Sequence, residues 1–167
     1  MQVYNLYKNR LYNASWRFFR NREDAEDAVQ DAFIKGFQKI NQLEDHANLG
    51  AWLHRIVINH SLDIIRKRKN IWVEDYDITA IKEEDDQFNE GENISVDFIK
   101  KCIDRLDEKY RVILILYLIE DYNHREISEL LQLKESTVRN QYIRGKVKLL
   151  ELIQKNKEHE FKENYTK

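Results

Sequence analysis

Basic and amide side chains recur between Lys134 and Leu149 at a spacing that puts them on one side of a helix. This stretch holds five basic residues and one acidic residue. In the major groove of DNA, arginine grips guanine, and asparagine or glutamine grips adenine, each through two hydrogen bonds. Hydroxyl side chains at the start of such a helix suit a phosphate or a base edge. The residues predicted to contact duplex DNA, here called the duplex face, are Ser136, Thr137, Arg139, Asn140, Gln141, Ile143, Arg144 and Lys146.

A helix-turn-helix is the element that would position the duplex face. Asn123 and Glu126 have the spacing of a capping box, and the apolar residues that follow indicate a short amphipathic helix. Gln132 and the next residue make a tight connection before a new helix begins near Glu135. A solvated helix with ordinary surface charge is the alternative, but the tight turn, the apolar stripe and the basic outer face coincide here. The residues expected to face inward from the second helix are Val138, Tyr142, Gly145 and Leu149.

A second polar face lies on the helix predicted from Gly50 to Lys69. An aromatic ring, an amide and arginines recur there opposite the apolar stripe. Bases stack on aromatic rings, amides read base edges and arginines hold phosphates, so this face suits a partly unstacked DNA strand. Cations at the end of a helix also complement its dipole, which is the simpler explanation for the basic run after Ile65. The residues of this strand face are Trp52, Arg55, Asn59, Arg66 and Arg68.

An acidic face lies on the helix predicted from Glu23 to Ile40, opposite its apolar stripe. Acidic side chains in a first turn favour the helix dipole, so a plain solvated face is the simpler interpretation. The functional interpretation is a docking surface for a basic partner protein. The residues of this acidic face are Asp24, Asp27, Gln30 and Asp31.

The whole chain is predicted to be all-α: two small helical bundles joined by a flexible acidic linker, with the helix-turn-helix in the second bundle. The 167 residues include no proline and only 4 glycines. We expect a first domain over residues 1–70, the linker over 71–94, a second domain over 95–155 and a charged tail over 156–167. The net charge of −2 hides a segregation, because the first domain carries +4 and residues 71–95 carry −8.

Signatures of catalysis are missing from the sequence. The five histidines show no metal-ligand spacing with Cys102, and there is no Gly-rich phosphate loop or nucleophile motif. We therefore predict no enzymatic activity, no metal and no cofactor. Cys102 is expected to be a buried thiol and His60 a packed core histidine. No signal peptide is visible and no apolar run approaches the roughly 20 residues that span a bilayer, so we expect a cytoplasmic protein.

Three segments together resemble the extracytoplasmic-function (ECF) sigma factors of the sigma-70 family of RNA polymerase subunits. Asp24 to Phe33 resembles the polymerase-docking motif of that family, and Ala51 to Arg66 looks like its promoter −10 helix. Ile127 to Asn140 is similar to its −35 helix-turn-helix. The three segments occur in the family's order, and the resemblance covers the chain from about Tyr4 to Leu152.

The resemblance implies a function and partners. The first domain would be sigma region 2, and its acidic face would dock on the β′ clamp helices of core RNA polymerase, with the β subunit as a further partner. The strand face and the loop from Asn41 to Asn48 would capture the melted −10 strand. The second domain would be sigma region 4, whose duplex face reads the −35 element. An anti-sigma factor would be a further partner, and RNA synthesis would belong to the polymerase.

The acidic block from Glu83 to Asp86 has two possible roles. It would either occupy a basic channel of the polymerase as a mimic of RNA, or act only as a soluble tether between the domains.

The chain also departs from the family's pattern. Many members carry glycine where this chain has Asp121-Tyr122, and often glycine at Gln132, serine at Asn140 and arginine at Gln141. The two amides would shift −35 preference towards adenine. Two rival functions stay open: a two-domain helix-turn-helix transcription regulator that does not replace the sigma subunit, and an adaptor that does not bind promoter DNA.

Overall fold

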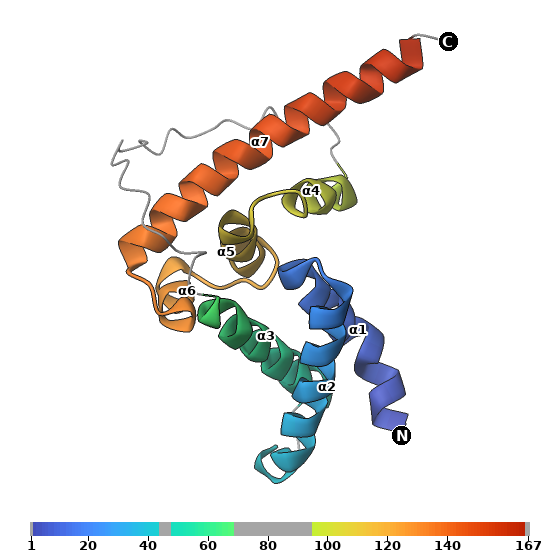
Figure 1. Ribbon diagram of the computed structural model, residues 1–167, viewed down its shortest axis with the longest axis vertical. Coiled ribbons are helices and arrows are strands. Elements are labelled where there is room, and N and C mark those ends of the chain that lie inside the picture. Colours follow the sequence, from blue (N-terminus) through green and yellow to red (C-terminus); the bar gives the residue numbers. More distant parts are fainter. Residues whose placement is uncertain (1, 44–47, 69–94, 166–167) are drawn as a thin grey trace. The chain divides into compact units, whose positions relative to one another are not determined.

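The computed structural model describes residues 2–43, 48–68 and 95–165, and every regular element in these ranges is a helix (Figure 1). The chain divides into two compact units, with the main boundary directly after Asn70. The all-α prediction is therefore confirmed. The predicted acidic linker, residues 71–94, lies outside the described residues, as does the proposed role of its acidic block.

Three α-helices build the first unit: α1 (Gln2–Phe19), α2 (Arg22–Gln38) and α3 (Leu49–Lys67). Each of them packs against the other two, and the short 3-10 helix η1 (Ile40–Gln42) follows α2 (Figure 1). The apolar stripes predicted from the sequence meet in the core of this unit. Its buried side chains include Leu11, Ala14, Phe18, Ala25, Ala28, Ala32, Phe33, Leu53, Val57 and Leu62.

Small residues let the helices of the first unit approach one another closely. A β-carbon added at Gly36 of α2 would lie 2.8 Å from Cδ2 of Leu53 on α3, closer than real β-carbons come to other atoms. The hydroxyls of Ser15 and Ser61 are fully buried and hydrogen-bond each other at 3.2 Å. This bond joins α1 to α3 and satisfies two polar groups that would otherwise be costly to bury.

Asparagine caps fix the starts of α2 and α3. Oδ1 of Asn21 accepts hydrogen bonds from the backbone N–H groups of Glu23 at 2.8 Å and Asp24 at 3.2 Å. Oδ1 of Asn48 accepts one from the N–H of Ala51 at 3.1 Å. A capping side chain pairs N–H groups that the first turn of a helix leaves unsatisfied. The caps therefore set the register in which α2 and α3 present their polar faces.

Four helices build the second unit: α4 (Val96–Ile103), α5 (Glu108–Leu118), α6 (His124–Leu131) and α7 (Glu135–Tyr165). Helix α5 packs against both α4 and α7. Every residue of α5 from Tyr110 to Leu116 is buried, so this stretch is the centre of the second unit.

Close packing also joins α5 to α7. A β-carbon at Gly145 of α7 would lie 3.2 Å from Cβ of Tyr110 and 3.3 Å from Cδ1 of Leu114. Arg111 is the one charged residue in the buried stretch of α5, and its Nη1 donates a hydrogen bond to the carbonyl of Leu106 at 2.7 Å. The core of the second unit thus depends on one helix that is enclosed on all sides.

The last helix extends beyond residue 155, the predicted end of the second domain. Helix α7 runs unbroken to Tyr165, so the predicted charged tail begins inside this helix. No proline occurs in the chain and no glycine follows Gly145, so the sequence holds no strong helix breaker in this region. Among the described residues, no helix combines the length and the apolar character that crossing a membrane requires.

The buried thiol predicted at Cys102 is confirmed in α4, and a serine caps this helix. Oγ of Ser95 accepts a hydrogen bond from the N–H of Phe98 at 3.2 Å and so caps the helix. Cys102 is a buried free thiol, and its Sγ accepts a hydrogen bond from Nδ2 of Asn156 at 3.6 Å. The thiol joins α4 to α7 as a packed side chain.

Candidate nucleic-acid and protein interfaces

The predicted helix-turn-helix is present as α6, a tight turn and α7. Oδ1 of Asn123 accepts from the N–H of Glu126 at 3.0 Å, and Oε2 of Glu126 accepts from the N–H of Asn123 at 2.8 Å, which completes the capping box. At the turn, Gln132 takes a left-handed conformation with φ 56°, and the N–H of Leu133 donates to the carbonyl of Ser128 at 3.0 Å. Glycine adopts this conformation at the least cost in steric strain. This gives a physical reason for the glycine that the family often has where this chain has Gln132.

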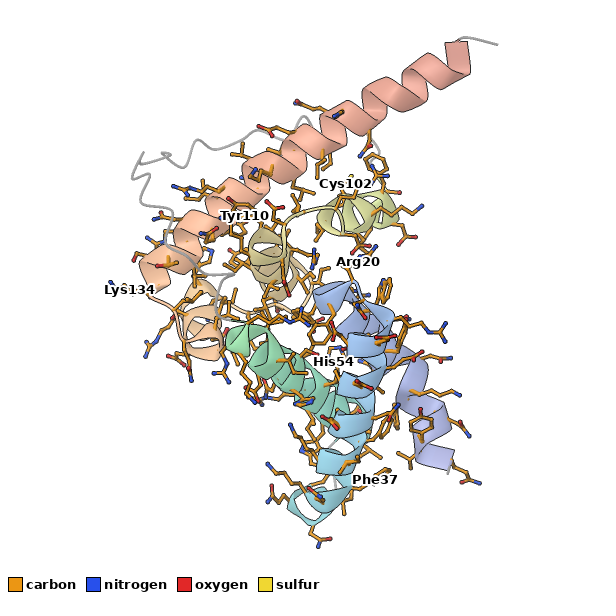
Figure 2. All side chains as sticks on the ribbon, in the orientation of Figure 1. Arg20, Phe37, His54, Cys102, Tyr110 and Lys134 are labelled. Carbon is orange, nitrogen blue, oxygen red and sulfur yellow. The ribbon has the colours of Figure 1, made fainter. Side chains whose placement is uncertain are left out.

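Most of the duplex face is accessible on the first turns of α7. Ser136, Arg139 and Asn140 are exposed, and the remaining members other than Gln141 are partly exposed. Arg139 forms an ion pair with Glu135 of its own helix, with Nη2 at 3.5 Å from Oε1. Figure 2 labels Lys134 where α6 gives way to α7, at the start of this face. The cations and the amide therefore line one side of a helix that begins at a tight turn.

One member of the predicted duplex face is buried. The side chain of Gln141 is 4% exposed, and its Oε1 has no hydrogen-bond partner among the described residues. Gln141 lies three residues after Val138 and four before Gly145, so it shares their inward stripe. The prediction that this amide reaches a base edge is therefore wrong for this structure.

The strand face of α3 ranges from exposed to half-buried. Arg55 and Asn59 are exposed. Trp52 is half-buried, and its Cζ3 would lie 3.6 Å from a β-carbon at Gly36 of α2, so one edge of the indole packs against that helix. Arg66 is half-buried and forms an ion pair within α3. The loop residues 44–47, which belong to the predicted strand-binding region, lie outside the described residues.

The acidic face is accessible along the outer side of α2. Asp27 and Gln30 are exposed, and the side chains of Asp24 and Asp31 keep 40% and 57% of their surface exposed. Their carboxylates and amide form a continuous strip because they recur at three- and four-residue intervals. The strip has the charge and accessibility that contact with a basic protein surface requires.

Two exposed apolar side chains continue the acidic strip towards the end of α2, and sequence reasoning missed them. Ile34 and Phe37 are 56% and 52% exposed. Ile34 follows Asp31 by three residues, and Phe37 follows Ile34 by three, so both extend the same side of the helix. Figure 2 places Phe37 near the C-terminal end of α2. The signal in the sequence was weak because Phe37 also fits the period of the apolar stripe of this helix.

An ion pair joins the acidic face to the strand face. Nη2 of Arg68, the residue that caps the end of α3, lies 2.7 Å from Oδ2 of Asp24 on α2. The guanidinium also stands over the ring of Phe19, at 5.2 Å from its centroid. Two residues predicted to meet different partners are therefore each other's partners in this structure.

A second polar connection between α2 and α3 involves His60. Its Nε2 lies 3.0 Å from Oδ2 of Asp31, and its Nδ1 lies 2.5 Å from Nζ of Lys35. The side chain of His60 is only 11% exposed, so the prediction that it packs is confirmed, but its polar partners were not foreseen. They could not be read from the sequence because they depend on how α3 crosses α2.

An apolar groove of about 500 Å³ opens in the second unit among α4, α5 and α7. Leu118, which is 50% exposed, and Val96, which is 65% exposed, are on its rim. The groove is large enough for several apolar side chains of a partner. Its lining residues are Val96, Ile99, Lys100, Ile103, Leu114, Leu118, Ile119, Tyr142, Lys146, Leu149, Leu150 and Ile153.

The polar groups of these interfaces are suited to binding. Within residues 2–43, 48–68 and 95–165, no three His, Cys, Asp or Glu side chains gather as a metal site. The faces instead present arginines, amides, carboxylates and a half-buried indole. These groups recognise charge, base edges and aromatic planes.

Comparison with known families identifies both units. The family model for Sigma-70 region 2 matches residues 3–71, and the model for Sigma-70 region 4 matches residues 99–149. The ECF RNA polymerase sigma factor SigW of Bacillus subtilis (strain 168) is 28% identical over 155 residues, which cover 86% of this chain and 83% of SigW. The ECF sigma factor SigE of Mycolicibacterium smegmatis is 31% identical over 153 residues, which cover 89% of this chain and 59% of SigE.

A solved structure shares the fold. The sigma factor RpoE of Bartonella quintana, crystallised in complex with the anti-sigma factor NepR, superposes with a TM-score of 0.52 at 24% sequence identity. The match covers 92% of this chain and 95% of that one. At this level of identity the match concerns the arrangement of helices.

Proposed function

This chain belongs to the ECF group of the sigma-70 family, and we propose that its three polar faces divide the work of promoter recognition between its two units. As a sigma factor it binds core RNA polymerase and directs transcription initiation at promoters, while the polymerase carries out RNA synthesis. The rival function of a regulator that does not replace the sigma subunit gains no support from these matches. We place the activity in the cytoplasm, where the polymerase works.

The acidic face is proposed to dock on the β′ clamp helices of core polymerase. Four of its features support this role: the strip is exposed, polar, continuous and borne by one helix. Single exposed ion pairs contribute only about 0.2–1 kcal/mol, so the acids mainly steer and orient the encounter. The exposed Ile34 and Phe37 at the end of the strip supply apolar area that desolvates on contact.

The strand face is proposed to hold the melted −10 strand. Trp52 offers an aromatic plane for a base, Asn59 an amide for a base edge, and Arg55 a cation for a phosphate. Arg66 and Arg68 extend the positive charge to the end of α3. Because these groups lie on one helix packed against α2 along its length, strand capture takes place on a rigid support.

The duplex face is proposed to read the −35 element from the major groove. Arg139 and Asn140 are the exposed pair with base-reading chemistry, for guanine and adenine respectively. Ser136 and Thr137 lie at the start of α7, where backbone N–H groups favour a phosphate. The other contacts in this proposal are Ile143, Arg144 and Lys146, and the buried Gln141 is left out.

Two further protein contacts complete the proposal. The apolar groove among α4, α5 and α7 is where we place an apolar segment of the β subunit, the second contact with core polymerase. An anti-sigma factor, as in the structure of the Bartonella quintana sigma factor, would hold this chain inactive by covering one or more of the three faces.

The observation that carries the proposal is the separation of three accessible polar faces from the buried apolar stripes of the same helices. It is tested by mixing the chain with core polymerase and selecting fragments from a genomic library. We expect the enriched fragments to share two short elements at a fixed spacing. Enrichment of the same fragments by core polymerase alone would contradict the proposal.

A further inference from the structure

Glu135 is the one acidic residue between Lys134 and Leu149, the stretch that carries the duplex face. It is the first residue of α7, directly after Lys134 (Figure 2). Its Oε1 lies 3.5 Å from Nη2 of Arg139, and the two side chains are 48% and 55% exposed. Because the proposed function assigns the start of α7 to a DNA phosphate, a carboxylate at this position repels the ligand of its own face.

The simplest role for Glu135 is to stabilise α7, since a carboxylate in the first turn of a helix favours the helix dipole. That role needs only an acid near the helix start and no particular partner. Glu135 has one, because residues four apart meet on the same side of a helix. Its partner is Arg139, the residue to which the proposed function assigns the reading of guanine.

We propose that Glu135 is a positioning residue of the duplex face, which holds the guanidinium of Arg139 in the orientation that pairs with guanine. Guanine accepts two hydrogen bonds from one arginine, so two N–H donors must reach its O6 and N7 together. A guanidinium has five N–H donors, so an ion pair and a base contact are compatible. The inference rests on the proposed function, because that function assigns Arg139 to a base pair of the −35 element.

A positioning carboxylate has two opposite effects on DNA binding. Its charge lowers the affinity for every duplex, whereas its contact with Arg139 raises the preference for guanine at one base pair. Removal of Glu135 should therefore increase binding to unrelated duplexes and decrease discrimination at that base pair. Because an exposed ion pair changes an equilibrium by a factor of about two to five, both effects are expected in that range. A role in helix stability alone would leave base preference unchanged.

The neighbouring helix α6 offers a matched control. Nε of Arg125 lies 3.3 Å from Oε1 of Glu129, four residues further along that helix. The two side chains are 80% and 67% exposed, and neither belongs to the duplex face. Glu129→Ala therefore removes the same charge and the same kind of ion pair from the helix-turn-helix without touching Arg139.

The experiment measures binding of polymerase holoenzyme, formed with the full chain, to duplexes that carry the −35 element enriched by fragment selection. Each base pair of the element is changed in turn, and Arg139→Ala shows which pair Arg139 reads. Glu135→Ala is expected to lower discrimination at that pair about two- to fivefold and to bind an unrelated duplex about two- to fivefold more tightly. Glu135→Gln should show the same gain but a smaller loss, because its amide oxygen still accepts a hydrogen bond from the guanidinium. Glu129→Ala should leave discrimination at the wild-type level.

A double variant shows whether Glu135 acts through Arg139. In the Arg139→Ala background, Glu135→Ala should cause no further loss of discrimination, because no guanidinium remains to be positioned. The inference is overturned if the loss is as large in that background, or if Glu135→Ala discriminates as well as wild type. Wild-type holoenzyme that does not prefer the enriched element over an unrelated duplex refutes the proposed function and the inference with it. A wild-type preference that Glu135→Ala leaves unchanged refutes the inference alone.

Discussion

The polar faces of the first unit are tied to one another across helices, whereas the duplex face of the second unit lies on a single helix. In the first unit, Asp24 pairs with Arg68 and Asp31 with His60, and both pairs join α2 to α3. In the second unit, Arg139 pairs with Glu135 of its own helix. Changes to the first unit's faces should therefore disturb helix packing and binding together, while the two effects should separate in the second unit.

The cores of the two units also differ in whether their contacts are shared among several helices or centred on one. The first is built on buried alanines and a buried serine pair, which bring three helices close together. The second is built around α5, whose branched aliphatic side chains are enclosed by its neighbours. Stability in the first unit is thus distributed over many close contacts, and in the second it is concentrated in one helix.

The largest expected effect comes from a substitution in the core of the second unit. Leu114 of α5 is fully buried and lies against Gly145, so Leu114→Ala should lower the free energy of unfolding by about 2–5 kcal/mol. Leu118→Ala is the matched control, because Leu118 is on the same helix and half exposed, and it should change stability by less than about 0.5 kcal/mol. Urea denaturation followed by circular dichroism measures both. A loss no greater than that of the control would contradict the concentration of stability in α5.

Removal of a buried hydroxyl tests how the core of the first unit is stabilised. Ser15→Ala removes one partner of the Ser15–Ser61 hydrogen bond and leaves the other hydroxyl buried alone, at a cost of about 1–3 kcal/mol. Ser15→Ala/Ser61→Ala removes both hydroxyls and should be more stable than the single variant. The fluorescence of Trp16 and Trp52, both in this unit, follows its unfolding. A double variant as unstable as the sum of the two single variants would refute the role of the pair.

A substitution in the duplex face should weaken DNA binding and leave the free energy of unfolding nearly unchanged. Arg139→Ala should weaken holoenzyme binding to a −35 duplex by about 1–3 kcal/mol and relax the preference at one base pair. Its stability should stay within about 0.5 kcal/mol of wild type, because the side chain is exposed. Lys155→Ala, an exposed cation farther along α7, is the control and should leave base preference unchanged. Loss of folding in Arg139→Ala would show that the face also supports the second unit.

The smallest expected effect concerns the turn of the helix-turn-helix. Gln132 has φ 56°, which glycine adopts with less strain, so Gln132→Gly should raise the free energy of unfolding by about 0.5–1 kcal/mol. Gln132→Ala keeps the β-carbon and should bring no such gain. Thermal unfolding of the two variants gives the comparison, and equal stability would show that the turn is not strained.

The fold could largely be predicted from the sequence because its helices carry clear apolar periods and caps. The capping box at Asn123 and Glu126 appears as predicted. Helix α7 continues through residues 156–165, which were predicted only as a charged tail. The left-handed φ angles of Asp121 and Gln132, 60° and 56°, match two places where the family was expected to have glycine.

The interfaces were less predictable, since they depend on how helices pack. Gln141 was assigned to the outer face by its chemistry, yet the period that it shares with Val138 buries it. The ion pair between Arg68 and Asp24 joins residues that are far apart in the chain, and no local sequence pattern predicts it. Side-chain chemistry alone therefore could not decide which residues of the three predicted faces point outward or pair with one another.

The central claim is that the apolar sides of these helices build the units while their exposed sides meet polymerase and promoter. The most direct test is run-off transcription with purified core RNA polymerase and a library of genomic templates. The account predicts discrete transcripts that require both the chain and the core enzyme, and that become weaker when Asp27→Lys reverses a charge on the exposed acidic face. Core enzyme that makes no new transcript from any template when the chain is added would contradict it.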